Sequence, residues 1–467
     1  MGSVLMFMFI RGRKKSQTTL TLTDSNLKQY LVVEDSARSV LDTSVHSDNS
    51  PTGGTWTTLG LERPMVIAMV GLPARGKSYI VKMMIRYFSW TGLVPQVFNV
   101  GAYRREIGLQ GADSNFFSSS NAQAKQVREE MAMKVQDAMY KWLHSHGSEQ
   151  RVAIFDATNT TKNRRLSLMK RAKRENVFLL FVESICDDEA VLSRNYELKL
   201  KNEDYRNMDK IKAKQDFIDR VRAYEKQYET IEDDEDNFDI SYIKLVNVGQ
   251  KVISRNCFGY LPSQVAFYLQ NVHIQPRKIY LSLNAETVGS EENTHQINIS
   301  HVDLTDGGRE YSLNLAKFIT MINTRDEKKG LDPRDSELLV LAGTSKANAE
   351  TILHLRMVCP CFNTPLLNEL RAGDLQGLST EDIKRDFPEE YINRNQDKLR
   401  YRYPGVGGES YLDVIERIRP VIIELERQRR SVLVVCHLAV LRCIYAYFSG
   451  TKVEEIPFLP IQLHEVI

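Results

Sequence analysis

One short segment combines glycines, a lysine and a serine at a spacing that is typical of phosphate binding. Residues 71–78 read GLPARGKS, which satisfies the pattern G-x-x-x-x-G-K-[ST] at every position. In this pattern the glycines let backbone N–H groups fold around a phosphate, and the N-terminus of the following helix faces the same anion. Lys77 can reach the β- and γ-phosphates of a nucleotide, and the Ser78 hydroxyl can hold Mg²⁺. The segment therefore predicts a nucleotide-binding loop.

A loop of this kind needs a second carboxylate near the metal ion, usually at the end of a neighbouring strand. Residues 152–155 form a short apolar run that ends at Asp156, which is the candidate for this role. Because Thr158 and Asn159 follow, Asp156 could instead cap a helix or close a turn. We favour the metal or substrate role.

Two pairs of adjacent arginines, Arg104-Arg105 and Arg164-Arg165, could bind a phosphorylated acceptor. A guanidinium group makes bidentate hydrogen bonds with phosphate. A small molecule that already carries a phosphate therefore fits better than a bare alcohol. The residues alone leave equally open that both pairs are simply solvated.

The elements that must position these residues are expected to be strands and helices in alternation. Apolar runs of strand length alternate with helical patterns, which implies a parallel sheet covered by helices on both faces. The expected strands of this first set are residues 66–70, 152–155 and 178–182, and the expected helices begin at Ser78 or cover 121–146 and 213–228. One apolar stripe is interpreted as core: Val127, Met131, Val135, Ala138 and Trp142. The acidic run at 232–236 predicts a solvated loop.

A second set of apolar runs begins after a change in composition at 262–276. Its expected strands and helices are residues 279–281, 309–321, 338–341, 411–428 and 432–435. We therefore expect two α/β domains, at 61–276 and 277–467. Residues 1–60 are rich in Ser, Thr, Asp and Gly without a sustained period, which predicts a mostly disordered tail that is a candidate regulatory segment.

The composition argues against several other classes of protein. Among 467 residues, 62 Lys+Arg stand against 60 Asp+Glu, and the net charge of +2 gives no reason to expect a nucleic acid or an anionic membrane as the main partner. The apolar run at 4–10 is too short to span a membrane. Six cysteines do not make a disulfide scaffold. We expect reduced cysteines and a cytoplasmic protein.

Several motifs together resemble the 6-phosphofructo-2-kinase/fructose-2,6-bisphosphatase family. They are GLPARGKS at 71–78, NVGAYRRE at 99–106, FDATNTT at 155–161, ESICD at 183–187, SYIK at 241–244 and YRYP at 401–404. The resemblance covers about residue 62 to the C-terminus. It implies a P-loop kinase domain with a parallel sheet, followed by a histidine-phosphatase α/β domain of the phosphoglycerate-mutase type. It also implies ATP as co-substrate, Mg²⁺ as cofactor, fructose 6-phosphate as acceptor, and a homodimer formed through the kinase domains.

The same resemblance implies roles for individual residues of the kinase domain. The implied catalytic residues are Lys77, Asp156 and Lys199, and the implied metal ligands are Ser78 and Asp156. The implied ATP-binding residues are Gly71, Ala74, Arg75, Gly76, Lys77, Ser78, Cys186 and Asn195. The implied fructose 6-phosphate residues are Arg104, Arg105, Thr158, Arg164, Arg220 and Tyr224.

Two positions of the kinase domain depart from the family pattern. The chain has one residue fewer between Asn195 and Lys199, which shifts the helix phase and leaves Lys201 as a possible substitute. Ser118 stands where many members have an arginine. The loss of one charged contact to the sugar phosphate would weaken binding by about 1.5–3 kcal/mol.

The second domain departs from the family at its reactive residues. The family motif Arg-His-Gly-Glu is replaced by LNAE, so that Asn284 stands in place of the histidine nucleophile. The lone pair of an amide nitrogen is delocalised, and it cannot form the phosphohistidine intermediate. Leu283 and Ala347 replace two phosphate-binding arginines, whereas Glu369 and His437 match the family.

The resemblance thus implies a kinase that transfers the ATP γ-phosphoryl to the 2-hydroxyl of fructose 6-phosphate. The product would be fructose 2,6-bisphosphate, a regulator of glycolysis, and phosphatase activity is expected to be absent. Two alternatives remain open at this point. The chain could be a non-catalytic ATP-binding regulator, or it could retain both activities.

Overall fold

The computed structural model describes the chain from residue 64 onward, with short gaps. The described residues are 64–112, 114–118, 120–145, 150–206, 208–235, 237, 239–274, 277–288, 302–327 and 338–467. Thr55–Ile467 forms one compact unit. The predicted tail at 1–60 lies outside the described residues.

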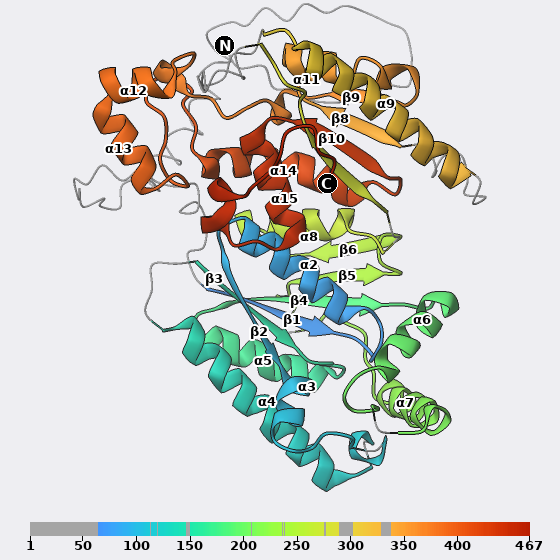
Figure 1. Cartoon of the computed structure of the whole chain (residues 1–467). Coiled ribbons are helices and arrows are strands. Elements are labelled where there is room, and N and C mark those ends of the chain that lie inside the picture. The colour runs from blue at the N-terminus through green and yellow to red at the C-terminus, as the bar shows by residue number, and fades with distance from the viewer. Residues whose placement is uncertain are drawn as a thin grey trace, which may run out of the picture. The chain divides into compact units, whose positions relative to one another are not determined.

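Six strands form the first sheet in the order β2-β3-β1-β4-β5-β6 (Figure 1). Their bounds are β1 Met65–Val70, β2 Val94–Asn99, β3 Arg151–Asp156, β4 Phe178–Ile185, β5 Tyr242–Val246 and β6 Lys251–Arg255. All neighbouring strands are parallel except β5 and β6, which are antiparallel. The predicted parallel sheet is therefore confirmed. Its antiparallel edge follows from the four-residue turn at 247–250, because so short a connection cannot join parallel strands.

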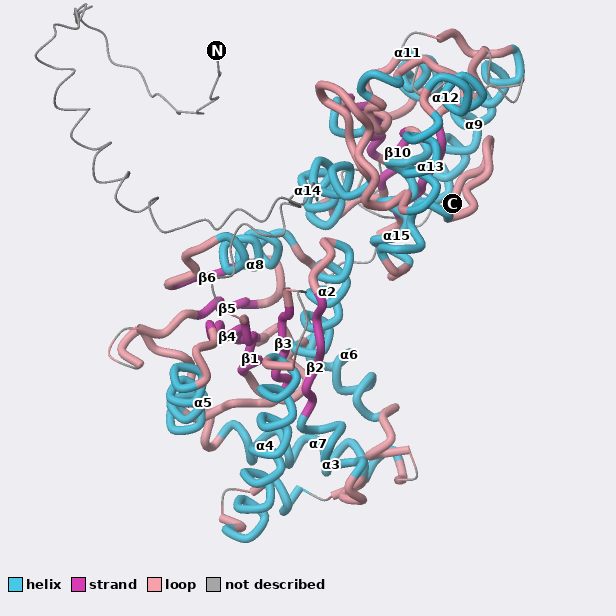
Figure 2. The backbone as a smooth tube through the Cα atoms, turned by 90° about the vertical axis from the view of Figure 1, so that its left-hand side faces the viewer, coloured by secondary structure: helices cyan, strands magenta, loops and turns pink. Residues whose placement is uncertain are grey.

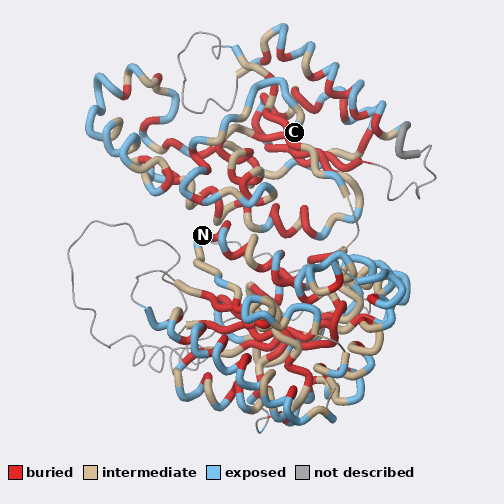
Figure 3. The backbone as a smooth tube through the Cα atoms, turned by 60° about the horizontal axis from the view of Figure 1, so that its bottom comes forward, coloured by how far each residue is buried: buried red, intermediate tan, exposed pale blue. Residues whose placement is uncertain are grey.

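Helices cover both faces of this sheet, because successive strand side chains point to opposite sides. In β1, Met65, Ile67 and Met69 pack in one core with α2 and α8, whereas the residues between them pack in a second core with α4 and α5. The central strands β1 and β3 are almost entirely buried, and Figure 3 shows a buried centre between the helices. The helix bounds are α2 Lys77–Trp90, α3 Val100–Glu106, α4 Ala122–Leu143, α5 Lys162–Arg174, α6 Glu189–Leu200, α7 Lys210–Glu225 and α8 Tyr260–Asn271.

Two details of the sequence interpretation were wrong. On α4, Ala138 is exposed, and the buried stripe continues instead through Met139. The acidic run at 232–236 is not entirely solvated. Glu235 is buried and receives hydrogen bonds from the guanidinium of Arg165, which is itself fully buried. Arg165 therefore holds a loop in place, and its charge is matched internally because a buried charge needs a partner.

Four parallel strands form the second sheet in the order β7-β10-β8-β9. Figure 2 shows β10 of this sheet among the helices of the C-terminal part of the chain. Their bounds are β7 Ile279–Leu283, β8 Leu339–Ala342, β9 Cys361–Asn363 and β10 Val432–Cys436. Helices α14 and α15 pack on one face and α9 on the other. The helix bounds here are α9 Asp306–Glu327, α11 Lys346–Thr351, α12 Thr380–Asp386, α13 Pro388–Gln396, α14 Tyr411–Arg427 and α15 Leu438–Ser449.

Helix α2 also contacts α15. Next to this contact, a buried carboxylate on α14 binds side chains from α2 and α15. Trp90 Nε1 donates to the Cys443 carbonyl at 2.8 Å. Glu426 accepts hydrogen bonds from Arg86 of α2, from Arg277 at 2.9 Å and from the Tyr447 hydroxyl at 2.6 Å. The helix that begins at the phosphate loop is therefore anchored at its other end to the C-terminal part of the chain.

All six cysteines are free. Among the residues that the structure describes, no helix is both long and apolar enough to cross a membrane.

Candidate functional site

The phosphate loop joins β1 to α2, as its pattern requires. Gly71 has a φ of 130°, and a Cβ added there would lie 2.5 Å from the Ser184 carbonyl oxygen, so only glycine fits. Gly76 adopts the left-handed conformation and leads directly into the helix. The backbone N–H of Gly71 donates to the Thr158 carbonyl at 2.9 Å. These contacts join the loop to the ends of two neighbouring strands, β3 and β4.

Lys77 begins α2 and folds back over the loop. Its Nζ donates to the carbonyl oxygens of Gly71 at 2.8 Å and Leu72 at 2.6 Å. Burial lowers the pKa of Lys77 to about 7, although the Asp156 carboxylate acts in the opposite direction. The loop therefore holds a lysine whose charge is only partly stabilised in the absence of an anion.

Asp156 ends β3 and is buried beside the phosphate loop. Asn99, at the end of the adjacent strand β2, donates from Nδ2 to Asp156 Oδ2 at 2.5 Å. Burial raises the pKa of Asp156, and the charge of Lys77 opposes this rise. The bond from Asn99 occupies only Oδ2, and Ser78 is an exposed residue. These oxygen donors fit Mg²⁺, which prefers carboxylate and hydroxyl oxygens over nitrogen or sulfur.

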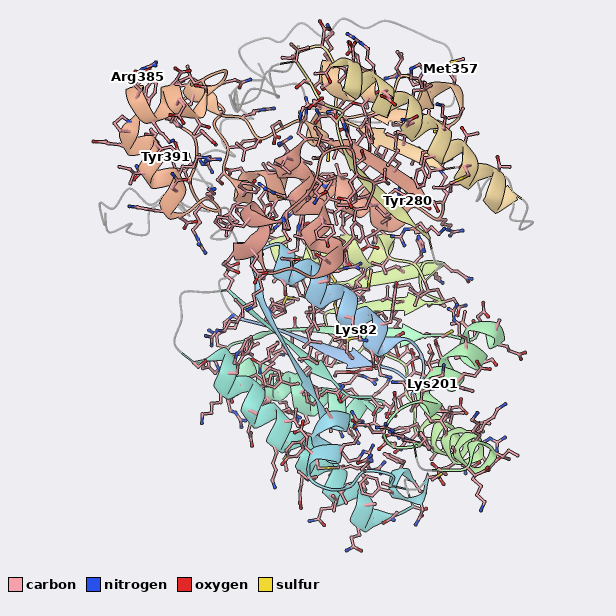
Figure 4. The ribbon with its side chains drawn as sticks, viewed as in Figure 1. Lys82, Lys201, Tyr280, Met357, Arg385 and Tyr391 are labelled. Atoms are coloured by element: carbon pink, nitrogen blue, oxygen red, sulfur yellow. The ribbon has the colours of Figure 1, made fainter. Side chains whose placement is uncertain are left out.

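The structure brings Lys199 to the same site despite the shortened segment before it. Lys199 lies in the last turn of α6 and is half-buried. Burial lowers its pKa, while the charge of Asp156 raises it. Lys201, the possible substitute, is exposed at the end of α6 (Figure 4). The lysine next to Asp156 is therefore Lys199.

Three of the expected ATP-binding residues lie in or near the phosphate loop. Asn195 donates from Nδ2 to the Ala74 carbonyl at 3.0 Å. Arg75 is buried and pairs with Glu225 at 3.3 Å. Cys186 follows β4 and is buried, and burial raises the pKa of its thiol. Asn195 thus ties α6 to the phosphate loop.

The expected sugar-phosphate residues fall into two groups. Arg104, Arg105 and Arg220 converge on the carboxylate of Asp204. The second group lies near the turn after β3. There Arg164 Nε donates to Asn159 Oδ1 at 3.1 Å, and burial lowers the pKa of Arg164 while the nearby Tyr224 raises it.

Sequence reasoning did not assign three residues of this region. Asn99 was visible only as part of a motif, and nothing indicated that it orients Asp156. Arg128 of α4 donates to the carbonyls of Phe117 at 2.8 Å and Ser118 at 3.2 Å, and it interacts electrostatically with Arg164. A cation therefore lies at the loop where Ser118 replaces the family arginine. Asp204 carried no signal, since it looks like one acidic residue in a polar segment.

The reactive positions of the second domain lie at the carboxyl ends of its strands. Leu283, at the end of β7, packs in the main apolar core, and Ala347 of α11 packs with Ala285 and Leu304. Apolar packing therefore occupies both positions where the family has arginines. Asn284 donates from Nδ2 to the Ala285 carbonyl at 3.1 Å.

The family histidine at the end of β10 is retained as His437, and its side chain lies within hydrogen-bond distance of another side chain of this domain. Its Nε2 lies 2.9 Å from the Ser345 hydroxyl. Burial lowers the pKa of His437, although the charge of Glu369 acts against this. Burial therefore disfavours the charged imidazolium form of His437, which is the form that attracts a phosphate.

A group of cations lies elsewhere in the second domain. Arg394 donates to the Tyr403 hydroxyl at 2.7 Å, and Arg442 donates to the Tyr411 hydroxyl at 3.2 Å. Burial lowers the pKa of Lys398, and the charges of Arg394 and Arg442 lower it further. The three cations are therefore near neighbours.

Both parts of the chain match known families. Residues 53–276 match the 6-phosphofructo-2-kinase family, and residues 284–467 match the histidine phosphatase superfamily, branch 1. The chain is thus a P-loop kinase joined to a histidine-phosphatase fold.

Proteins from distant organisms are similar to most of this chain. Over 405 residues the chain is 39% identical to 6-phosphofructo-2-kinase/fructose-2,6-bisphosphatase 3 of Rattus norvegicus. This match covers 86% of this chain and 69% of that protein. It is 41% identical over 414 residues to the Caenorhabditis elegans 6-phosphofructo-2-kinase/fructose-2,6-bisphosphatase, with 86% of each chain covered. A Schizosaccharomyces pombe protein named probable 6-phosphofructo-2-kinase is 36% identical over 474 residues, which covers 91% of this chain and 70% of that protein. The chain belongs to the 6-phosphofructo-2-kinase/fructose-2,6-bisphosphatase family.

Proposed function

We propose that the kinase transfers the γ-phosphoryl group of Mg-ATP to the 2-hydroxyl of fructose 6-phosphate. The 2-oxygen forms the new P–O bond, the bond to the β-phosphate oxygen breaks, ADP leaves, and the hydroxyl proton passes to water. The observation that carries this proposal is the convergence of Lys77, Asp156 and Lys199 beside the phosphate loop. Phosphoryl transfer needs alignment and charge neutralisation more than covalent chemistry.

Each group has a separate part in the proposal. The ammonium groups of Lys77 and Lys199 neutralise charge on the transferring phosphoryl oxygens. Ser78 and Asp156 would hold Mg²⁺, which supplies further charge neutralisation and orients the phosphates. Asn99 keeps the Asp156 carboxylate in one orientation through its hydrogen bond. The arginines orient the 6-phosphate of the sugar.

The decisive experiment incubates the purified chain with Mg-ATP and fructose 6-phosphate and measures fructose 2,6-bisphosphate. We expect product that depends on both substrates. Tight ATP binding without any product would contradict the proposal and would favour a non-catalytic regulator.

Lys77 should also make ATP binding depend on protons. With a pKa of about 7, Lys77 is about nine-tenths neutral at pH 8 in the free protein. The phosphates of ATP favour the charged ammonium and raise its pKa, so binding at pH 8 should take up about one proton and binding at pH 6 almost none. Calorimetry in buffers of different ionisation enthalpy measures this uptake. Equal uptake by wild type and Lys77→Met at pH 8 would refute the assignment.

We also propose that the second domain lacks phosphatase activity. Asn284 offers no nucleophilic nitrogen, burial disfavours a charged His437, and apolar side chains at Leu283 and Ala347 take the places of the two arginines. These losses act on one reaction and are not additive rate factors.

A single replacement should not restore phosphatase activity. We expect Asn284→His to release no more phosphate from fructose 2,6-bisphosphate than wild type does, since both arginines remain absent. Phosphate release at the rate of a bifunctional relative, assayed in parallel, is the result that would contradict this account. Phosphate release by the wild-type chain itself would favour the bifunctional alternative.

Further proposals rest on the family resemblance and the composition. We propose a regulatory tail at 1–60, a kinase domain at 61–276 and a degenerate phosphatase domain at 277–467. We also propose a cytoplasmic homodimer formed through the kinase domains. Sedimentation equilibrium of the full chain tests the dimer, because a monomer at micromolar concentration would be incompatible with it.

A further inference from the structure

Asp204 lies between α6 and α7 and faces three arginines at once. Its Oδ2 accepts a hydrogen bond from Arg104 Nη2 at 2.5 Å and lies 3.8 Å from Arg105 Nη1 and 3.9 Å from Arg220 Nη1. Its Oδ1 accepts from the Gly111 backbone N–H at 3.2 Å. Only 10% of the Asp204 side chain is exposed. One buried carboxylate thus joins α3, α7 and the loop that follows α3.

The three arginines are not equivalent in this arrangement. Arg104 is buried, and its second terminal nitrogen, Nη1, donates to the Leu109 carbonyl at 2.5 Å, so the protein engages both ends of its guanidinium. Arg105 and Arg220 approach Asp204 only at ion-pair distance. Arg220 also stacks on the Phe117 ring at 3.7 Å and hydrogen-bonds Tyr205. Arg105 and Arg220 therefore keep donors for a ligand, whereas Arg104 is held fixed.

The charges around Asp204 explain why a carboxylate is needed there. Three guanidinium groups around one point repel each other, and burial strengthens that repulsion because the effective dielectric constant falls. Burial lowers the pKa of Arg104, and the charge of Arg220 adds to this effect while Asp204 opposes it. Burial alone would raise the pKa of Asp204, but Arg104 and the Gly111 hydrogen bond outweigh it, and the pKa is lowered. Asp204 is therefore ionised at neutral pH.

We propose that Asp204 is a positioning residue for the sugar-phosphate site, which it preorganises by holding Arg104 and keeping Arg105 and Arg220 together. Without its charge the arginines repel one another. Part of the binding free energy of the sugar phosphate is then used to bring the arginines together, which weakens binding. Asp204 acts through the arginines and touches neither ATP nor the transferring phosphoryl group. This inference rests on the proposed function, because it assumes that these arginines bind fructose 6-phosphate.

The test is Asp204→Asn, which keeps an oxygen acceptor for Arg104 but removes the charge. We expect the KM for fructose 6-phosphate to rise about tenfold, while the KM for ATP and kcat change by less than about twofold. Glu203→Gln is the matched control. Glu203 is the adjacent carboxylate, lies 3.6 Å from Arg105 and is 68% exposed, so its removal should leave every constant unchanged.

A double-mutant cycle adds a readout that a merely structural role would not change. In an Arg105→Met background, Asp204→Asn should raise the KM for fructose 6-phosphate by less than it does in wild type, because one of its partners is gone. Equal effects of Asp204→Asn and Glu203→Gln, or a rise in the KM for ATP as large as that for the sugar, would overturn the proposal. If Asp204→Asn melts at a clearly lower temperature, Asp204→Glu replaces it. That variant displaces the charge by one bond, and an unchanged KM for fructose 6-phosphate would then overturn the proposal.

Failure of this inference is distinguishable from failure of the proposed function. If wild type forms no fructose 2,6-bisphosphate, the proposed function fails. If wild type forms product and Asp204→Asn behaves as Glu203→Gln does, only the role of Asp204 fails.

Discussion

Lys77→Met should reduce the formation of fructose 2,6-bisphosphate by about a thousandfold, because it removes a cation from the transferring phosphoryl group. Methionine has nearly the same length as lysine, so the side chain still fills the space over the loop. Its ammonium donates to the loop carbonyls and interacts electrostatically with the Asp156 carboxylate. The measurement is the steady-state rate at saturating Mg-ATP and fructose 6-phosphate.

The loss should not come from unfolding. Burial lowers the pKa of Lys77 to about 7, so the charged form is disfavoured in the folded protein and an apolar side chain removes that cost. The melting temperature of Lys77→Met should therefore equal or exceed that of wild type.

Lys82→Met is the matched control, because it makes the same exchange on the same helix. Lys82 is exposed on α2 (Figure 4). Its replacement should leave the rate within about twofold of wild type, since surface substitutions rarely disturb a site. A Lys77→Met variant that keeps more than a tenth of the wild-type rate would refute the role assigned to Lys77.

Glu426→Ala should destabilise the chain by about 3–5 kcal/mol, because it leaves two arginines without their buried carboxylate. Glu426 is 2% exposed, and it accepts hydrogen bonds from Arg86, Arg277 and Tyr447. We expect the melting temperature to fall by about 6 °C or more. Differential scanning calorimetry measures the shift.

This substitution also tests what the second domain does. Arg86 belongs to α2, whose first residue is Lys77, so the contact with Glu426 supports the helix that carries the phosphate loop. Kinase activity of Glu426→Ala should therefore be lost on heating at the lower temperature at which the variant melts. This outcome would give the degenerate domain a structural role in the kinase.

Glu424→Ala provides the comparison on the same helix. Glu424 pairs with the exposed Arg427 three residues later, and such surface pairs contribute only about 0.5 kcal/mol. Its melting temperature should stay within about 2 °C of wild type. If Glu426→Ala melts in the same range as Glu424→Ala, the contact with Glu426 does not support α2.

Features that depend on neighbouring residues could be predicted from the sequence. The phosphate loop was predictable because residues 71–78 follow one another and the apolar run before them forms β1. The parallel sheet was predictable because its central strands are apolar throughout. By contrast, the pairing of Glu235 with Arg165 was missed, since an acidic run has the same composition whether it is solvated or buried.

Two of the site residues that were missed, Asn99 and Asp204, act on partners that are far away in the chain. Asp204 lies 100 residues from Arg104, and no spacing rule connects them. Arg128 reaches the loop at Ser118 only because α4 packs beside it. The shorter segment before Lys199 left two lysines possible, and the position of α6 distinguished them.

The sequence by itself determined the chemistry that this protein can carry out. The identities at Lys77, Asp156 and Asn284 decide which groups can bind phosphate or attack it, and these are properties of single side chains. The tertiary structure decided which groups meet. Apolar packing at Leu283 and the three arginines around Asp204 arise only when strands and helices distant in the chain come together, because electrostatic and packing energies depend on distance in space.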